Sequence, residues 1–214
     1  MTRNRCIRMV ALALCALACL GVLCACATDG EEALTERVFF DTDRIADYVR
    51  LDRYTDLTIL LERADDSRSE AVWDALLERA EILSMPEEQL NYYAEQTRSA
   101  YRHYAEEHDL DYPAVLAHFE TSEEQILEEA EQMVKGDLVY HYILVDTGLA
   151  LTEEEKENLF DRYAAKFAAD YGYTKDYVKE SMGELVYDAM LYDKTTQYLM
   201  DRNTFEIASA TETE

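Results

Sequence analysis

Cysteine, glycine and proline are scarce in this chain of 214 residues. All five cysteines lie in the N-terminal stretch that ends at Cys26, so disulfides cannot hold the remainder together. Only six glycines and two prolines occur, which argues against a loop-rich or all-β architecture. Because 49% of the residues are apolar, the chain can still bury a core, and its length suits one ordinary domain with at most a short appendage.

Basic side chains are also few. The chain carries 20 lysines and arginines against 46 aspartates and glutamates, which gives a formal net charge of −26. Arg3, Arg5 and Arg8 stand at the start, so the rest of the chain is more acidic still. Such a surface repels nucleic acid and anionic lipid head groups, and we therefore exclude a nucleic-acid-binding role.

The beginning of the chain has the layout of a signal peptide. Arg3, Arg5 and Arg8 precede an uncharged apolar run from Met9 to Leu23. The following Leu23-Cys24-Ala25-Cys26 resembles the bacterial lipobox, so we expect a signal peptide over residues 1–25 and lipidation of Cys26. A single-span anchor and plain secretion are the alternatives. Each of the three places the domain outside the cytoplasm, and the lipid anchor places it at the extracytoplasmic face of the cell membrane.

Helix signals dominate the chain after residue 68. We expect Ser69 to cap a first helix, Ser84 with Pro86 to begin a second that runs to about His108, and Asp111 to begin a short third. Thr121 or Ser122 should cap a fourth helix that stops at Gly148, with Glu124 completing a capping box from Thr121. Thr152 should cap a fifth that ends at Gly172, and Thr174 a last one with a seven-residue apolar rhythm as far as Leu199.

Two β-prone runs, Tyr48–Leu51 and Leu57–Leu61, precede these helices and follow a short helical turn near Asp43. The predicted fold class is therefore all-α, with long and short antiparallel helices over residues 69–206. A tether and linker-like segment would occupy residues 26–68, and a disordered tail residues 207–214.

The order and spacing of several segments between Ala71 and Phe205 resemble the C-terminal chaperone domain of bacterial trigger factor. That fold is shared with the helical core of SurA-type periplasmic chaperones. The matching segments are Val72–Leu76, Met85–Glu88, Ala130–Val139, Leu149–Glu155 and Phe167–Gly172. Residues Tyr48–Leu51 and Tyr54–Ile59 resemble the linker that precedes the isomerase module of that family.

The departures from trigger factor limit what the resemblance implies. A signal peptide stands where that family has a ribosome-docking domain, and only Glu62–Arg68 lies where an FKBP-type isomerase would be inserted. Ribosome binding and prolyl isomerisation are therefore not implied. What the resemblance implies is a cradle of helical arms that holds unfolded polypeptide without a cofactor.

A cradle needs adaptable apolar side chains that the core does not use. The chain has 16 tyrosines and several methionines that meet this requirement. The candidate peptide-binding residues are Tyr92, Tyr93, Tyr101, Tyr104, Met133, Tyr140, Tyr142, Met182 and Met190. Tyrosine at helical spacing is also common in cores and at their edges, so packing is the competing interpretation of each.

No catalytic constellation is recognisable. The four histidines have no metal-binding spacing, the acidic pairs fit helix starts, and neither a phosphate-binding glycine loop nor a Ser-His-Asp order occurs. We therefore expect a tethered extracytoplasmic chaperone or holdase that is not an enzyme and needs no metal. The alternatives are an interaction lipoprotein with one specific envelope partner, an inactive remnant, and an enzyme of unrecognised type.

Overall fold

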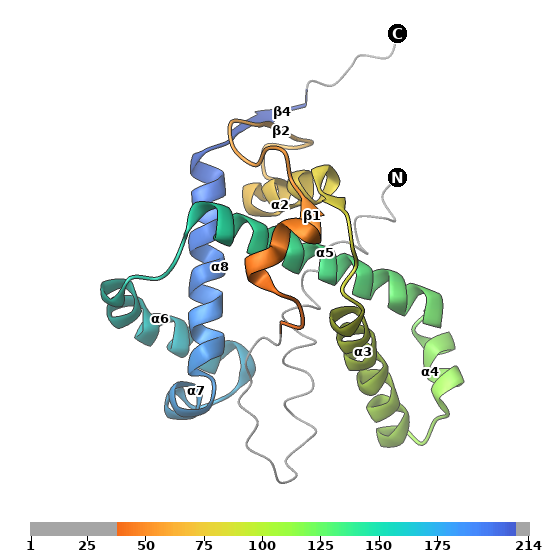
Figure 1. Ribbon diagram of the computed structural model, residues 1–214. Helices are drawn as coiled ribbons and strands as arrows, with labels where there is room; N and C mark the ends of the chain where they lie inside the picture. Colours follow the sequence, from red (N-terminus) through yellow and green to blue (C-terminus); the bar gives the residue numbers. More distant parts are fainter. Residues whose placement is uncertain (1–37, 209–214) are drawn as a thin grey trace. The chain divides into compact units, whose positions relative to one another are not determined.

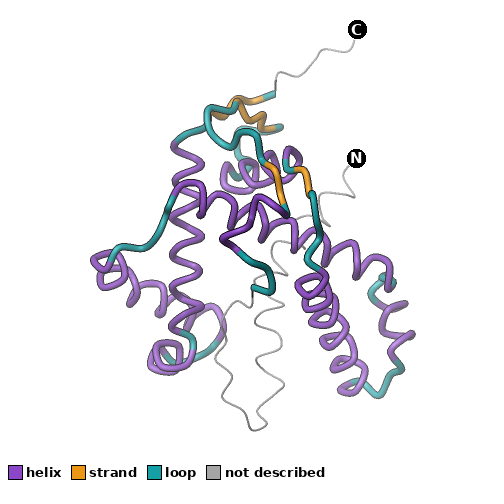
Figure 2. The backbone as a smooth tube through the Cα atoms, in the orientation of Figure 1, coloured by secondary structure: helices purple, strands orange, loops and turns teal. Residues whose placement is uncertain are grey.

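The computed structural model describes residues 38–208 (Figures 1 and 2). The predicted signal peptide and Cys26 lie outside the described residues. The helices are η2 (Thr42–Asp47), α2 (Arg68–Arg79), α3 (Glu87–Glu107), α4 (Tyr112–His118), α5 (Glu123–Thr147), α6 (Glu153–Tyr171), α7 (Lys175–Ser181) and α8 (Gly183–Asp201). The strands are β1 (Val49–Arg50), β2 (Thr58–Leu61), β3 (Glu81–Ile82) and β4 (Thr204–Ile207). The predicted all-α class is confirmed, because helices make up most of the described chain (Figure 2).

The described residues form two compact units. The first unit contains Val38–Phe40 and Ser84–Asp137, and the second contains Asp41–Leu83 and the chain from Leu138 onward. The division falls inside α5. The sequence predicted a single helical domain over 69–206 after a separate linker, whereas contacts assign residues 41–83 to the same unit as α6, α7 and α8.

The first unit is a helical hairpin that α5 extends. Helix α3 packs against α4, and the chain turns between them at Asp109, which has a left-handed φ of 53°. The buried side chains of this unit are mainly apolar and come from all three helices. They include Tyr93, Ala94, Ala105, Val115, Ile126, Ala130 and Val134.

The second unit is built around α8, which contacts α2 and α6 (Figure 1). Its core includes Leu76, Leu138, Ile143, Val186 and Leu199. Strand β1 pairs antiparallel with β3, and β2 pairs parallel with β4, with Thr58 opposite Thr204. The predicted disordered tail was wrong at its first residue, because Ile207 pairs with Leu61 in this parallel ladder.

Two predicted helix starts were wrong in detail, and a third had two candidate caps of which one is observed. Ser67, not Ser69, caps α2, since its Oγ accepts the Glu70 N–H at 3.3 Å. Pro86 occupies the N-cap of α3 without a side-chain hydrogen bond, so Ser84 is not the cap. Ser122 rather than Thr121 caps α5, through the Gln125 N–H at 3.2 Å, and the predicted box from Thr121 to Glu124 does not form.

The capping box at Thr152 is confirmed, with the Glu155 N–H donating to Thr152 Oγ1 at 3.2 Å. The long last helix expected from Thr174 is instead two helices, α7 and α8. Met182 lies between α7 and α8 with the non-helical angles φ −130° and ψ 19°, and it is followed by Gly183, a residue with poor helix propensity.

No helix in the described range 38–208 combines the length and apolar character needed to cross a membrane.

Candidate functional site

A group of rings lies where α3 ends and α4 approaches it, and we call it the end cluster. It consists of Tyr101, Tyr104, His108, His118 and Phe119. The Phe119 ring centroid lies 5.0 Å from that of Tyr104 and 5.5 Å from that of Tyr101. The His108 ring stacks on Tyr104 at 3.9 Å. Local structure explains the gathering, because Tyr101 and Tyr104 are one turn apart on α3 and Phe119 is the C-cap of α4.

The end cluster presents apolar surface to solvent. Phe119 is 45% exposed, and Leu110 in the adjoining turn is 44% exposed. Tyr101 and Tyr104 are half-buried, so their rings support Phe119 while keeping accessible surface. Partly exposed rings of this kind can bury additional area against a ligand with little loss of side-chain freedom.

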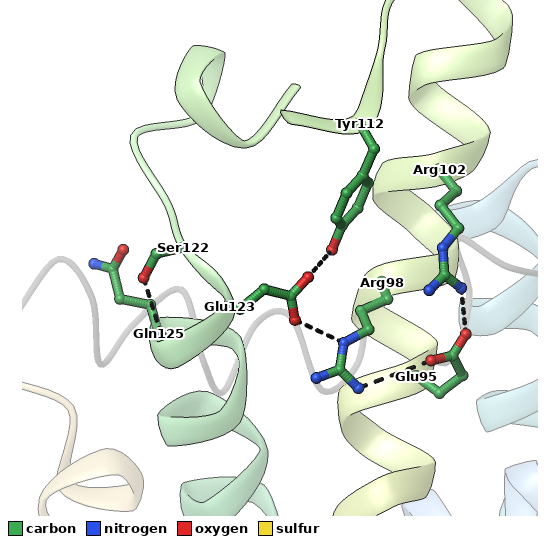
Figure 3. A network of polar contacts seen from close by, with 7 residues as sticks. All are labelled: Glu95, Arg98, Arg102, Tyr112, Ser122, Glu123 and Gln125. Atoms are coloured by element: carbon green, nitrogen blue, oxygen red, sulfur yellow. Dashed lines mark hydrogen bonds and ion pairs between the residues drawn. The ribbon is translucent and has the colours of Figure 1, made fainter. Parts of the chain in front are cut away.

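A polar network holds α4 and the start of α5 against α3 (Figure 3). Glu123 is its centre, accepting the Tyr112 hydroxyl at 2.7 Å and Arg98 Nε at 2.8 Å. Glu95 pairs with both Arg98 and Arg102. The hydrogen bonds from Tyr112 and Arg98 lower the pKa of Glu123, so it is ionised at neutral pH. The network therefore fixes the hairpin whose end carries the exposed rings.

A second group lies nearer the N-terminus of α3, and we call it the base cluster. Gln89 is fully buried, and its Nε2 donates to Asp137 Oδ2 at 3.0 Å. The Tyr93 hydroxyl donates to the same oxygen at 2.6 Å. Gln89 Oε1 accepts the main-chain N–H of Phe39 at 2.8 Å.

Asp137 has an unusual protonation equilibrium. Desolvation raises its pKa from 3.8 to about 7, although the hydrogen bonds from Tyr93 and Gln89 act in the opposite direction. The carboxyl group of Asp137 therefore titrates near neutral pH in the folded protein.

The nine predicted peptide-binding residues do not form one group. Tyr92, Tyr93, Tyr101, Tyr104 and Met133 belong to the first unit, and Tyr140, Tyr142, Met182 and Met190 to the second. Tyr101 and Tyr104 are in the end cluster, and Tyr92 and Tyr93 adjoin Gln89 on α3. Met133 is half-buried on α5. A role in client binding for any of them stays a prediction.

Burial divides these residues further. Four are core side chains: Tyr93 is 7%, Tyr140 8%, Met182 1% and Met190 2% exposed. Tyr140 packs edge-on against Trp73 at 6.3 Å, as the packing interpretation of tyrosine expects. Tyr142, by contrast, is half-buried. The proposals below use residues with accessible surface, together with Gln89 and Tyr93, which lie beside Phe39 and Tyr92.

Sequence reasoning missed Phe119, His108 and His118 of the end cluster, and Gln89, Asp137 and Phe39 of the base cluster. A usable signal existed for Phe119, since an apolar ring directly after a short helix and before the polar Glu120-Thr121-Ser122 is not expected in a core. Gln89 and Asp137 are separated by 48 residues, and nothing in the pattern pairs them. Within residues 38–208, no group of three or more His, Cys, Asp or Glu side chains is placed to hold a metal ion.

The sequence profile of the family described as bacterial trigger factor protein (TF) C-terminus matches residues 58–201, which is more than half of the chain. Among curated proteins, no sequence gives a significant match. The family match spans α2 to α8 and confirms the resemblance seen in the sequence. The chain therefore belongs to the family of the bacterial trigger factor C-terminus.

Proposed function

We propose that this protein is a holdase that binds unfolded polypeptide outside the cytoplasm, tethered to the membrane by a lipid on Cys26. The family supports a chaperone-type function and the binding of unfolded clients. The observation that carries the proposal is the end cluster, where Phe119 and Leu110 keep 45% and 44% of their surface exposed to water. No nucleotide or metal takes part in this mechanism.

The energetics of the end cluster suit weak and reversible holding. Covering an exposed ring and its neighbours removes on the order of 100 Å² of apolar surface from water, which is worth about 2–3 kcal/mol before association costs. One such contact gives a weak complex, so several along a client are needed for useful affinity. A holdase benefits from this, because each contact releases quickly when the client begins to fold.

The strong negative charge also supports the holdase proposal. With a net charge of −26, complexes between this protein and a sticky client repel one another, which opposes joint aggregation. Tethering would raise the local concentration of the holdase where chains emerge at the membrane.

The proposal includes no prolyl isomerisation. The loop Glu62–Ser67 directly joins β2 to α2, at the point where the resemblance places the isomerase module. The loop closes on itself, with the Arg63 N–H donating to Asp66 Oδ2 at 2.8 Å. The proposal therefore assigns no isomerase activity to this short loop.

The test is suppression of aggregation. A chemically unfolded, aggregation-prone model protein is diluted into buffer with the purified protein and no nucleotide, and light scattering is followed against the molar ratio. We expect suppression near stoichiometric ratios. Phe119→Ser should raise the ratio needed several-fold, whereas Tyr177→Ser should not. Tyr177 is a matched control because it is also 45% exposed and also contacts a neighbouring ring, that of Tyr173.

An interaction lipoprotein with one envelope partner is the rival account. It predicts no suppression of scattering by a protein whose circular dichroism shows intact helices. Equal loss in Phe119→Ser and Tyr177→Ser would also contradict the holdase proposal, because the end cluster would then have no special role.

A further inference from the structure

A three-residue segment, Val38–Phe40, lies on the first unit although the chain that follows it belongs to the second. We call this segment the strap. It has no regular helix or strand structure, and η2 begins just after it at Thr42. The strap therefore contacts the α3 region as a short piece of irregular chain, much as a segment of another polypeptide would.

The strap is held first through its main chain. The Phe39 N–H donates to Gln89 Oε1 at 2.8 Å. Because Gln89 Nε2 is engaged by Asp137 at 3.0 Å, the amide has one orientation, and its oxygen is left facing the strap. Every residue except proline has a main-chain N–H, so this contact can be made with almost any sequence.

The strap is held secondly through its rings. The Phe39 ring lies 5.2 Å from that of Tyr92, which in turn lies 5.5 Å from that of Tyr93. Phe40 is only 9% exposed, whereas Phe39 keeps 37% of its surface. An apolar side chain beside a main-chain hydrogen bond is what an unfolded client segment also offers.

We propose that Gln89, Tyr92 and Tyr93 form a second polypeptide-binding subsite, which the strap occupies until a client segment displaces it. The ligand is an extended segment with an apolar or aromatic residue whose N–H is free to donate to Gln89. The strap thus acts as a built-in competitor, and its release is part of client binding. This inference rests on the proposed holdase function.

The two groups on α3 are suitably spaced for one client. Tyr92 and Tyr104 are twelve positions apart, which is about 18 Å along a helix. An extended segment of about six residues covers that distance. A client segment of this length that displaces the strap therefore spans the axial distance to the end cluster.

The size of the effect follows from competition. A ligand that binds only the strap-free form has its affinity reduced by the fraction of molecules in that form. If the strap is closed in about nine molecules of ten, removing its hold tightens client binding about tenfold.

The experiment measures binding of a fluorescein-labelled peptide with Val-Phe-Phe between Gly-Ser flanks, by fluorescence anisotropy with the purified protein. We expect Phe39→Ser, which removes the strap ring, to bind this peptide about five- to tenfold more tightly than the unaltered protein. Adding Gln89→Leu to Phe39→Ser should remove the gain. Tyr92→Ser with Phe39→Ser should do the same and guards against misfolding at the buried Gln89.

A modified peptide tests the main-chain contact without altering the protein. N-methylation of the first Phe of the probe removes the N–H that would reach Gln89. It should weaken binding about two- to tenfold, the range expected for a lost hydrogen bond. The Phe39→Ser, Gln89→Leu variant should show no such difference between the two peptides.

The outcomes separate this inference from the holdase proposal. If the peptide binds the unaltered protein and Phe39→Ser equally well, the strap is not a competitor, and the inference fails while the holdase stands. Weaker binding to Phe39→Ser also overturns it, since Phe39 would then be part of the binding surface. Failure of every variant to bind the peptide, with no suppression of aggregation, overturns both. Binding that appears only in Phe39→Ser supports the inference and shows the strap to be tightly closed.

Discussion

The Tyr93 hydroxyl on α3 donates a 2.6 Å hydrogen bond to Oδ2 of Asp137 on α5. The same oxygen accepts Gln89 Nε2, so a single carboxylate holds both side chains of the base cluster. The protonation state of Asp137 should therefore affect the stability of the fold.

Stability should fall as pH rises through the range in which Asp137 titrates. In the unfolded chain an aspartate has a pKa of 3.8, whereas in the fold it is raised to about 7 by desolvation. Between these values the folded protein keeps a proton that the unfolded chain has lost, so stability falls with increasing pH across that window. We expect a loss on the order of 2 kcal/mol between about pH 5 and about pH 8, measured by urea unfolding.

The variant Asp137→Asn should remove most of this pH dependence, because the amide stays neutral and still offers an oxygen to Tyr93 and Gln89. Asp161→Asn is the control, since Asp161 is exposed and its pKa is lowered by Lys179 and Lys175. An unchanged slope in Asp137→Asn would contradict the assignment of this proton.

The Trp73 indole gives a second prediction, in the core of the second unit. Its Nε1 donates to Thr196 Oγ1 at 2.9 Å, and the ring stacks on Tyr192 at 5.3 Å. Thr196→Val removes the acceptor and leaves a buried N–H unsatisfied, which should lower the free energy of unfolding by about 1–3 kcal/mol.

Thr195→Val is the matched control for this change. Both threonines are buried and both donate to a carbonyl one turn earlier on α8, but the indole bond belongs to Thr196. Equal losses in the two variants would show that the indole bond adds nothing measurable.

Loss of the polar network around Glu123 should lower the stability less than loss of the Trp73 hydrogen bond. Glu123→Gln weakens the contacts to Tyr112 and Arg98, and the Glu123 side chain is half exposed to water. We expect the free energy of unfolding to fall by about 0.5–1 kcal/mol, the upper part of the range for solvent-accessible ion pairs, and to fall less at high salt. Glu124→Gln, in the same first turn of α5, should change less. A large, salt-independent loss would contradict the solvent access of the Glu123 carboxylate.

The tether is tested at Cys26. Cys26→Ala should move the protein from the membrane fraction to the soluble fraction of cells, whereas Cys24→Ala should leave it at the membrane. Mass spectrometry of the N-terminal peptide should find a lipid on Cys26 in the unaltered protein. Retention of Cys26→Ala at the membrane would favour the single-span anchor.

Local signals predicted most of the helical framework. Thr152, Thr174 and Asp111 each cap a helix as expected, because an N-cap depends on residues within one turn. The break at Met182 was missed because a regular apolar rhythm continues across it, and Gly183 is a weak signal beside that rhythm. Local residue pattern therefore identified helix starts better than helix interruptions.

Long-range pairings were beyond the sequence. The partner of β4 is β2, far earlier in the chain, so a tail that lacks its own β-signal pairs only after the fold is assembled. The base cluster could not be predicted for the same reason. Phe39, Gln89 and Asp137 are far apart in the sequence and meet only when their segments pack together. Tyrosine spacing found Tyr101 and Tyr104 but could not distinguish them from the buried Tyr93 and Tyr140.

The most direct test of the account places the photoreactive amino acid p-benzoylphenylalanine at position 119 and, in a separate protein, at position 177. Each is illuminated with a radiolabelled model protein, once unfolded and once native. We predict a strong cross-link from position 119 to the unfolded form alone and little from position 177, although Phe119 and Tyr177 are equally exposed at 45%. Equal cross-linking from both positions, or none from position 119, would contradict a polypeptide-binding role for the end cluster.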